Sequence, residues 1–290
     1  MKAPAFTYHD PRTLADLKGL LGSLENVRML AGGQSLMPML NMRFVIPDNV
    51  VDLNRIPELT GIRETAAGIE IGAMTRQRAI ERDPLVKAKA PALVEALSHV
   101  GHIQTRSRGT FGGSLCHLDP ASEQPGIAAL YDATLSVTGP RGDRTIALPD
   151  WVLGYMTPAL EPDEALIKVT LKPWTEKHGH GFAEFARRHG DYAIVACAAL
   201  LALDGAGKVA RAAISLVGVD VKPVRLAAAE TALVGQMPTA EAFAAAAEVA
   251  RGLECLSDAH VAADYRQRLA GVMTRRALEA AALRASGAGA

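Results

Sequence analysis

Apolar and polar positions in the first part of the chain predict a small unit of helix and strands. Thr13 precedes a helical apolar pattern over Leu14–Leu24, and Asp16 follows three residues later, as in a capping box. The short apolar runs Val27–Leu30 and Asn49–Leu53 have the length of strands. This mixture of a helix with short strands predicts an α+β arrangement.

The middle part of the chain is also predicted to contain both strands and helices, and more of them. Ile69–Ile71 alternates apolar and polar residues as a half-buried strand does, and Thr75 is placed to cap a helix that ends near Asp83. A further helix is predicted over Ala121–Tyr131. The glycine- and proline-rich stretch Gly139–Asp143 lies between two strand-like runs, which is typical of a hairpin.

The last part of the chain reads as a meander followed by helices. Ala183–Arg188, Tyr192–Asp204 and Val209–Val219 are consecutive strand-like runs, and they predict a three-stranded antiparallel sheet. Helices are expected over Thr239–Gly252 and Asp258–Arg284. The predicted class is therefore α+β, in units that cover residues 1–55, 56–174 and 175–290.

Composition narrows the class of protein. Of the 290 residues 49% are hydrophobic and 21% are charged, which is ordinary for a globular protein, and the formal net charge is zero. We therefore expect no nucleic acid and no anionic membrane surface among its partners. The N-terminal residues lack the apolar core of a signal peptide, and no run of about 18 apolar residues occurs, so we expect a cytoplasmic protein without a membrane span.

Cysteines and histidines give no metal site. Cys116, Cys197 and Cys255 lie far apart, and an iron–sulfur cluster normally takes four thiolates, so this chain cannot hold a four-cysteine cluster by itself. His178 and His180 are too few for a zinc site, and we expect them in a loop.

Two glycine-rich segments are the candidates for a ligand-binding site. They are AGGQSLMPMLNMR at residues 31–43 and RGTFGGSLCHLDPASEQPG at residues 108–126. Glycine lets the backbone approach a ligand closely, and successive N–H groups of such a segment can bind phosphate oxygens. A single Gly-Gly pair is more often a turn, and neither segment matches GxGxxG or a P-loop. Two such segments in one chain raise the odds of a dinucleotide site, with ordinary turns as the alternative.

At these residues the chain resembles a known family, the FAD-binding medium subunits of molybdenum hydroxylases, which include carbon monoxide dehydrogenase and xanthine dehydrogenase. Residues 31–38 are similar to the family's Ala-Gly-Gly-x-Ser-Leu-x-Pro segment, and the second segment is similar to its Arg-Gly-Thr-Ile-Gly-Gly segment. RRHGDYAIV at residues 187–195 resembles a third family motif, and the three occur in the family's order.

The resemblance implies a fold, a cofactor and site residues. The fold is the two-subdomain FAD-binding fold of the vanillyl-alcohol oxidase/molybdenum hydroxylase type, followed by a C-terminal domain. The implied FAD pyrophosphate contacts are Ala31, Gly32, Gly33, Gln34, Ser35, Leu36, Thr110, Phe111, Gly112, Gly113 and Ser114. Glu123 is implied at the adenosine end, Leu166 near the flavin or adenine, and Tyr192 against the isoalloxazine ring.

The resemblance also implies partners. A large subunit would carry the molybdenum cofactor and a small subunit the [2Fe-2S] clusters, in a dimer of heterotrimers. The chain would be an oxidoreductase subunit without a catalytic residue of its own, passing electrons through FAD to an external acceptor. Some relatives have a Lys before the third motif where this chain has GFAEFA, which leaves the acceptor open.

Two other functions remain open from the sequence. One is a self-sufficient FAD-dependent oxidase or reductase, although little of the chain remains to form a substrate domain. The other is a non-catalytic assembly protein that keeps the same fold.

Overall fold

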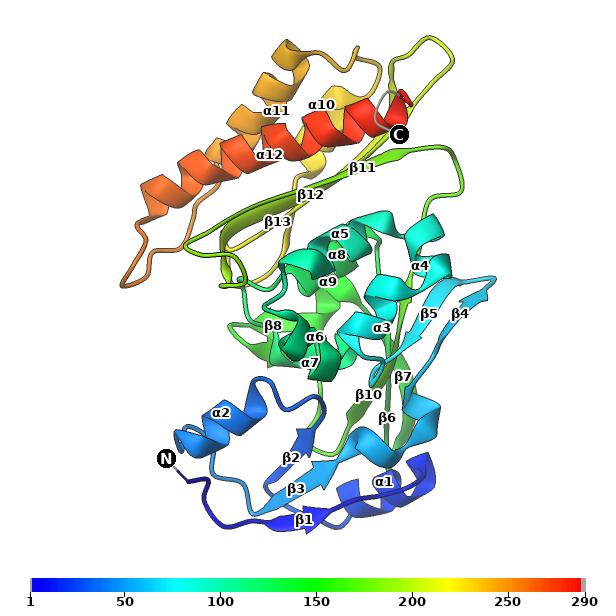
Figure 1. Cartoon of the computed structure of the whole chain (residues 1–290), viewed down its shortest axis with the longest axis vertical. Coiled ribbons are helices and arrows are strands. Elements are labelled where there is room, and N and C mark those ends of the chain that lie inside the picture. Colours follow the sequence, from blue (N-terminus) through cyan, green and yellow to red (C-terminus); the bar gives the residue numbers. More distant parts are fainter. Residues whose placement is uncertain (1, 288–290) are drawn as a thin grey trace.

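The computed structural model describes residues 2–287, and its three main sheets follow one another along the long axis of the molecule (Figure 1). The first is a parallel three-stranded sheet with the order β1-β3-β2. Its part of the chain comprises β1 (Thr7–His9), α1 (Leu14–Leu21), β2 (Val27–Leu30), α2 (Leu36–Asn41), β3 (Asn49–Asp52) and the 3-10 turns η1 (Leu53–Arg55) and η2 (Pro57–Leu59).

Helix α1 begins where the sequence pattern predicts. The Thr13 hydroxyl accepts from the Asp16 backbone N–H at 3.1 Å, and the Asp16 carboxylate accepts from the Thr13 backbone N–H at 3.1 Å. This capping box satisfies two N–H groups that the first turn would otherwise leave unpaired. The predicted cap is confirmed.

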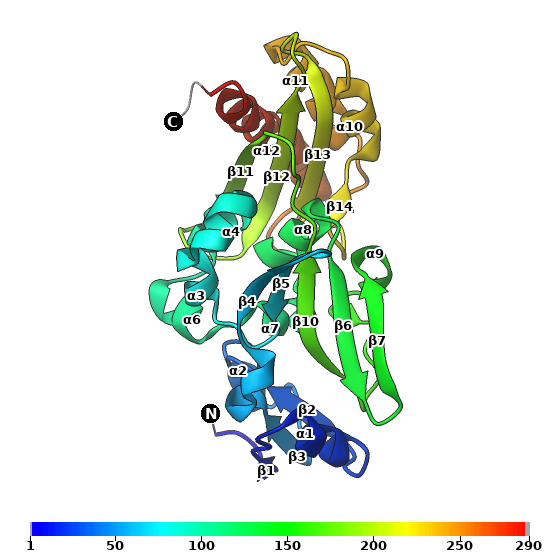
Figure 2. The ribbon, with the colours of Figure 1, turned by 90° about the vertical axis from the view of Figure 1, so that its right-hand side faces the viewer.

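The second sheet has five strands, all antiparallel, in the order β4-β5-β10-β6-β7 (Figure 2). Helices α3 to α8 pack together beside this sheet (Figure 1). The strands are β4 (Ile62–Thr65), β5 (Gly68–Gly72), β6 (Thr134–Gly139), β7 (Gly142–Ala147) and β10 (Ala165–Leu171), and β8 (Val152–Gly154) pairs with β9 (Thr157–Pro158). The helices are α3 (Gln77–Arg82), α4 (Pro84–Lys89), α5 (Pro91–His99), α6 (Ile103–Arg108), α7 (Phe111–His117), α8 (Glu123–Leu130) and α9 (Leu148–Trp151).

One predicted cap in this part is wrong. Thr75 does not cap α3, whose N-terminal flanking residue is Arg76. The Thr75 hydroxyl instead bonds the backbone of Gly61, donating to its carbonyl at 3.1 Å and accepting from its N–H at 3.0 Å. A long-range partner thus replaces the local cap. The predicted hairpin around Gly139–Asp143 is present as β6 and β7.

The third sheet is antiparallel, with the order β11-β12-β13-β14. The three predicted strands are confirmed, and the sheet has a short fourth strand, β14, whose two residues carry no sequence pattern. Strand β11 also begins earlier than expected, so the loop predicted at His180 is strand. The elements are β11 (Gly179–Ala186), β12 (Ala193–Leu203), β13 (Val209–Val217), β14 (Val224–Arg225), α10 (Ala227–Leu233), α11 (Ala240–Arg251) and α12 (Ala263–Ala285).

Strand β12 is buried on both faces, which explains its nearly continuous apolar sequence. Ala196, Ala198 and Leu200 belong to the core shared with the five-stranded sheet and its helices. Val195 and Cys197, on the other face, belong to the core under α10, α11 and α12. A third core lies in the N-terminal part and includes Leu17 and Leu59. The C-terminal sheet is therefore packed between two layers.

Among the described residues, no helix is both long enough and apolar enough to cross a membrane.

Candidate functional site

The two glycine-rich segments touch each other, although 64 residues, 44–107, lie between them. A Cβ on Gly32 would lie 2.3 Å from the Arg108 carbonyl oxygen and 2.8 Å from the Gly109 Cα. A Cβ on Gly113 would lie 3.4 Å from the Cβ of Ala31. Only glycine permits the approach at position 32, because any side chain would collide with backbone. The tertiary structure thus joins the two segments into one site.

The first segment presents free backbone donors. Gly33 adopts φ +74°, a conformation that L side chains rarely take. Neither a carbonyl nor a side chain within residues 2–287 accepts a hydrogen bond from the N–H groups of residues 32–36. Ser35 flanks α2, and its hydroxyl makes no capping bond. A run of unpaired N–H groups around a left-handed glycine is the arrangement that binds phosphate oxygens.

Residues 111–114 of the second segment do not present such donors. The Phe111 N–H bonds the Thr75 carbonyl at 3.1 Å, and the Gly112 N–H bonds the Ala73 carbonyl at 2.9 Å. The Thr110 hydroxyl accepts from the Gly113 N–H at 3.1 Å, and the next N–H bonds the Thr110 carbonyl. The expectation that both segments offer free N–H groups is therefore wrong for residues 111–114. This segment offers a glycine surface and the Ser114 hydroxyl, which lies 3.0 Å from the Ser122 hydroxyl.

Two of the expected site residues are core residues. The Phe111 side chain is fully buried, and Leu166 in β10 is 4% exposed. Both belong to the core around the five-stranded sheet. A β-bulge separates Leu166 from Lys168 in the pairing of β10 with β6, which bends the strand at this position.

The third motif reaches the first segment through Tyr192. This residue precedes β12, and its side chain is half exposed. Partial burial raises the pKa of Tyr192 to about 12, the nearby Asp119 and Glu123 add to the rise, and the neighbouring Ser35 hydroxyl lowers it. The turn before it is anchored at Gly190, where a Cβ would lie 3.0 Å from the Gly101 carbonyl oxygen. All three motifs therefore meet in one region.

Glu123 is a buried acid beside this region. It is the first residue of α8 and is 3% exposed. Burial raises the pKa of Glu123 to about 8, and the charges of Glu184 and Asp119 add to the rise. At neutral pH a large share of this carboxyl carries a proton, so Glu123 can donate a hydrogen bond as well as accept one.

The charged side chains near this region have structural partners, and they form no metal site among the described residues. The Arg106 guanidinium bonds Glu81 at 3.2 Å and the Val100 carbonyl at 3.0 Å, so it supports the loop before α6. His180 Nε2 lies 3.4 Å from a Glu95 carboxylate oxygen. Within residues 2–287 no group of three or more His, Cys, Asp or Glu side chains is placed to hold a metal ion.

Two further residues, Asn54 and Arg76, connect the glycine segments. The Asn54 amide donates to the Ala31 carbonyl at 2.9 Å, and Arg76 bonds both Asn54 and the Arg108 carbonyl. No local pattern signals these contacts, because their partners lie 22 to 32 residues away.

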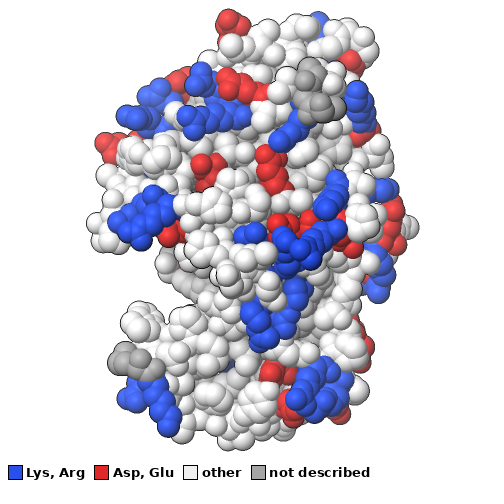
Figure 3. Space-filling view, in the orientation of Figure 1, with Lys and Arg blue, Asp and Glu red and all other residues white. Residues whose placement is uncertain are grey.

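The surface around this region is hollowed. Figure 3 shows an indentation between the part of the molecule that carries α2 and the part above it, bordered mostly by uncharged residues. The geometry thus combines a concave surface, free N–H donors, hydroxyl groups and a tyrosine, which suits a large ligand with a phosphate-containing middle.

Two domain families match the chain and together cover most of it. Residues 4–174 match the family described as FAD binding domain in molybdopterin dehydrogenase. Residues 180–281 match the family described as CO dehydrogenase flavoprotein C-terminal domain.

Individual relatives match over nearly their full length. The carbon monoxide dehydrogenase medium chain of Hydrogenophaga pseudoflava is 35% identical over 97% of this chain and 98% of its own. The 6-hydroxypseudooxynicotine dehydrogenase complex subunit alpha of Paenarthrobacter nicotinovorans is 36% identical over 98% and 97%. A chain of quinoline 2-oxidoreductase from Pseudomonas putida 86 superposes with a TM-score of 0.94 at 37% identity, covering 98% of this chain and 99% of that one.

Proposed function

This chain belongs to the FAD-binding medium subunits of the carbon monoxide dehydrogenase and xanthine dehydrogenase family, and we propose that it is the electron-transfer subunit of a heterotrimeric molybdenum hydroxylase. As a member of that family it is a flavoprotein and a subunit of an oxidoreductase. The observation that carries the proposal is the contact between the two glycine segments beside Tyr192, within a chain that matches the family along nearly its full length.

The residues present fit FAD. The unpaired N–H groups of residues 32–36 suit the anionic pyrophosphate, and Ser35 and Ser114 add hydroxyl groups. We propose that Tyr192 lies against the isoalloxazine ring and that Glu123 contacts the adenosine end. The proposed site comprises Ala31, Gly32, Gly33, Gln34, Ser35, Leu36, Thr110, Phe111, Gly112, Gly113, Ser114, Glu123, Leu166 and Tyr192. Of these, the buried Phe111 and Leu166 would shape the site from the core.

Bound FAD supplies the redox chemistry, and the protein contributes binding, orientation and electrostatics. The chain would receive electrons from [2Fe-2S] clusters of a small subunit, while a large subunit would carry the molybdenum cofactor and act on the substrate. The names of the relatives support a complex, since they are a medium chain and a subunit of a dehydrogenase complex. Four points stay predictions. They are the dimer of heterotrimers, the external electron acceptor, the cytoplasmic location, and the division into units at residues 1–55, 56–174 and 175–290.

The first test is cofactor content. The chain is purified together with its neighbouring gene products, and released flavin, iron and molybdenum are measured after an absorption spectrum. We expect FAD, iron and molybdenum in one complex. FAD without either metal, in a single chain that turns over a substrate, would replace the proposal with a self-sufficient flavoenzyme. A colourless chain that cannot be reconstituted with FAD would favour an assembly protein.

The second test concerns the glycine segments. We expect Gly33→Val and Gly113→Val to abolish FAD retention while far-ultraviolet circular dichroism stays close to that of the unchanged protein. A side chain at Gly33 is strained at φ +74°, and one at Gly113 meets the Thr110 hydroxyl at 2.7 Å, which disturbs the cap of α7. Flavin content per chain is the measurement.

Two glycines serve as matched controls. Gly235 has φ +80° with open space around its Cβ position, so Gly235→Val carries the same backbone strain far from the site. Gly19 lies in α1 with open space, and Gly19→Val controls for a valine at a helical glycine. Normal flavin content in both site variants would overturn the assigned role of the segments.

A further inference from the structure

A series of hydrogen bonds through Arg76 and Asn54 connects the two glycine segments. The Arg76 guanidinium donates through Nη1 to the Arg108 carbonyl and through Nη2 to the Asn54 Oδ1 atom. The Asn54 amide donates in turn to the Ala31 carbonyl at 2.9 Å. Arg76 therefore joins the residue before Gly32 to the residue before Gly109.

Further hydrogen bonds hold both Asn54 and Arg76 in place. The Asp52 carboxylate accepts from the backbone N–H of Asn54 at 2.8 Å, which fixes the amide at the end of β3. Arg76 forms an antiparallel bridge with Thr110, and the Gln77 N–H bonds the Gly109 carbonyl at 2.9 Å. The guanidinium is thus pre-organised, so little side-chain freedom is lost in forming its two bonds.

The Arg108 carbonyl that Arg76 holds is also the atom that Gly32 approaches most closely. A Cβ on Gly32 would lie 2.3 Å from this oxygen. Movement of the Arg108 carbonyl would therefore change the distance between the two segments directly. Since the unpaired N–H groups lie on one segment and the Ser114 hydroxyl on the other, this distance sets the width of the phosphate-binding space.

Arg76 carries a positive charge that no carboxylate among the described residues contacts directly, although the charge of Asp52 acts on it from nearby. Within residues 2–287 Arg76 forms no ion pair, although it is half buried. Its guanidinium bonds only a carbonyl and an amide oxygen, both neutral. A partly buried cation beside the glycine segments attracts an anion bound between them. The attraction is stronger there than in bulk water, because the protein screens charges less than water does.

We propose that Arg76 is a positioning residue for FAD, which sets the spacing of the two glycine segments through Asn54 and stabilises the pyrophosphate with its positive charge. The proposal rests on the proposed function, because it takes FAD as the ligand of the segments. It adds to that function a residue outside the three sequence motifs.

Three variants separate the two roles. Arg76→Met removes the bonds and the charge, Arg76→Lys keeps the charge but cannot reach both acceptors, and Asn54→Ala breaks the connection while leaving Arg76 in place. Arg82→Met is the matched control, because Arg82 is an exposed arginine of α3, the helix that Arg76 flanks. The measurements are the dissociation constant of FAD for the full-length chain, its dependence on KCl concentration, and the melting temperature without FAD.

We expect Arg76→Met to weaken FAD binding by about 10- to 100-fold, as for loss of a charged hydrogen-bond donor. The KCl dependence should also become flatter, because the screened charge is gone. Arg76→Lys should restore the KCl dependence but not the affinity, and Asn54→Ala should weaken binding with an unchanged KCl dependence. Arg82→Met should bind FAD as the unchanged protein does.

The outcomes distinguish the inference from the proposed function. An unchanged chain that does not bind FAD overturns both. If the unchanged chain, Arg76→Met and Arg76→Lys all bind FAD with the same affinity, the role of Arg76 alone is overturned. A lower melting temperature with unchanged FAD affinity makes Arg76 merely structural and also overturns the inference. If Arg76→Met fails to fold, Arg76→Lys and Asn54→Ala decide the question by the same measurements.

Discussion

Glu123 shows how burial changes what one residue can do. Its pKa rises from 4.5 to about 8, first because of burial and then because of Glu184 and Asp119. A carboxyl whose pKa is raised by folding stabilises the protein fully below its unfolded pKa, and this contribution is lost as the pH rises through the folded pKa. The FAD-free protein should therefore lose stability from this group between pH 4.5 and about 8. We expect Glu123→Gln to be more stable than the unchanged protein at the upper end of this range, by on the order of a few kcal/mol.

Thermal unfolding across this pH range measures the effect. The difference between Glu123→Gln and the unchanged protein should shrink toward pH 4.5, where both side chains are neutral. Glu25→Gln, an exposed site, is the control and should follow the unchanged protein at every pH. A constant difference at all pH values would mean that Glu123 is ionised throughout.

At the scale of elements, the packing of β11 against α12 explains the glycines of the HGHG sequence. A Cβ on Gly181 would lie 2.1 Å from the Ala277 carbonyl oxygen, and one on Gly179 would lie 1.9 Å from the Ala281 carbonyl oxygen. The glycines let the helix approach the strand, while His180 turns to the Glu95 carboxylate on the other face. Gly181→Val should therefore displace α12 and lower the free energy of unfolding by about 3 kcal/mol or more.

Urea unfolding followed by circular dichroism measures this loss. Gly205→Val is the control, because a Cβ at Gly205 meets no atom within 4 Å in the turn between β12 and β13. Equal stability of the two variants would contradict the close packing of α12 on β11.

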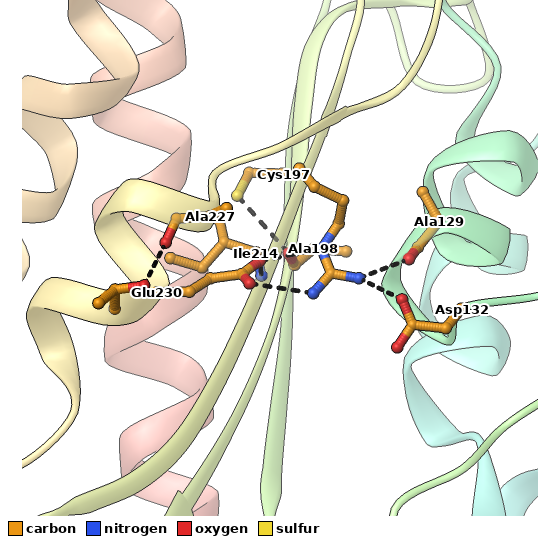
Figure 4. Close-up of polar contacts among 9 residues, drawn as sticks. Ala129, Asp132, Cys197, Ala198, Ile214, Ala227 and Glu230 are labelled. Carbon is orange, nitrogen blue, oxygen red and sulfur yellow. Dashed lines mark hydrogen bonds and ion pairs between the residues drawn. The ribbon is translucent and has the colours of Figure 1, made fainter. Parts of the chain in front are cut away.

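At the scale of the whole molecule, Arg225 connects the C-terminal sheet to the part that carries most of the proposed FAD site. Its guanidinium bonds Glu230 on one side and the Ala129 carbonyl and Asp132 on the other, and these three partners are labelled in Figure 4. The bonds to Ala129 and Asp132 are both 2.8 Å long, and they reach the end of α8, the helix that begins at Glu123. Arg225→Met should destabilise the fold by about 1–3 kcal/mol, because it leaves partly buried acceptors without a donor.

Limited proteolysis and thermal unfolding together test this connection. Cleavage between the two parts should become faster in Arg225→Met, since fewer contacts hold them together. Arg251→Met removes only an exposed ion pair with Glu248 in α11 and should change stability by less than about 1 kcal/mol. Indistinguishable behaviour of the two variants would show that Arg225 does not couple the two parts.

Much of this protein is determined by its sequence alone. The capping box at Thr13, the hairpin around Gly139–Asp143 and the meander of β11, β12 and β13 depend on residues close together in the chain, so local patterns predict them. The glycine segments and RRHGDYAIV also identify the family correctly, because close backbone approach restricts which residues can occupy such positions.

The tertiary structure decided the properties that depend on distant partners. It bonded the N–H groups of residues 111–114 to Thr75, Ala73 and Thr110, whereas it left those of residues 32–36 free. It raised the pKa of Glu123 by burying the side chain near other acids, and it placed Arg76 and Asn54 between the two glycine segments. The physical reason is common to all of these, because burial and long-range hydrogen bonds arise only when elements far apart in the chain pack together.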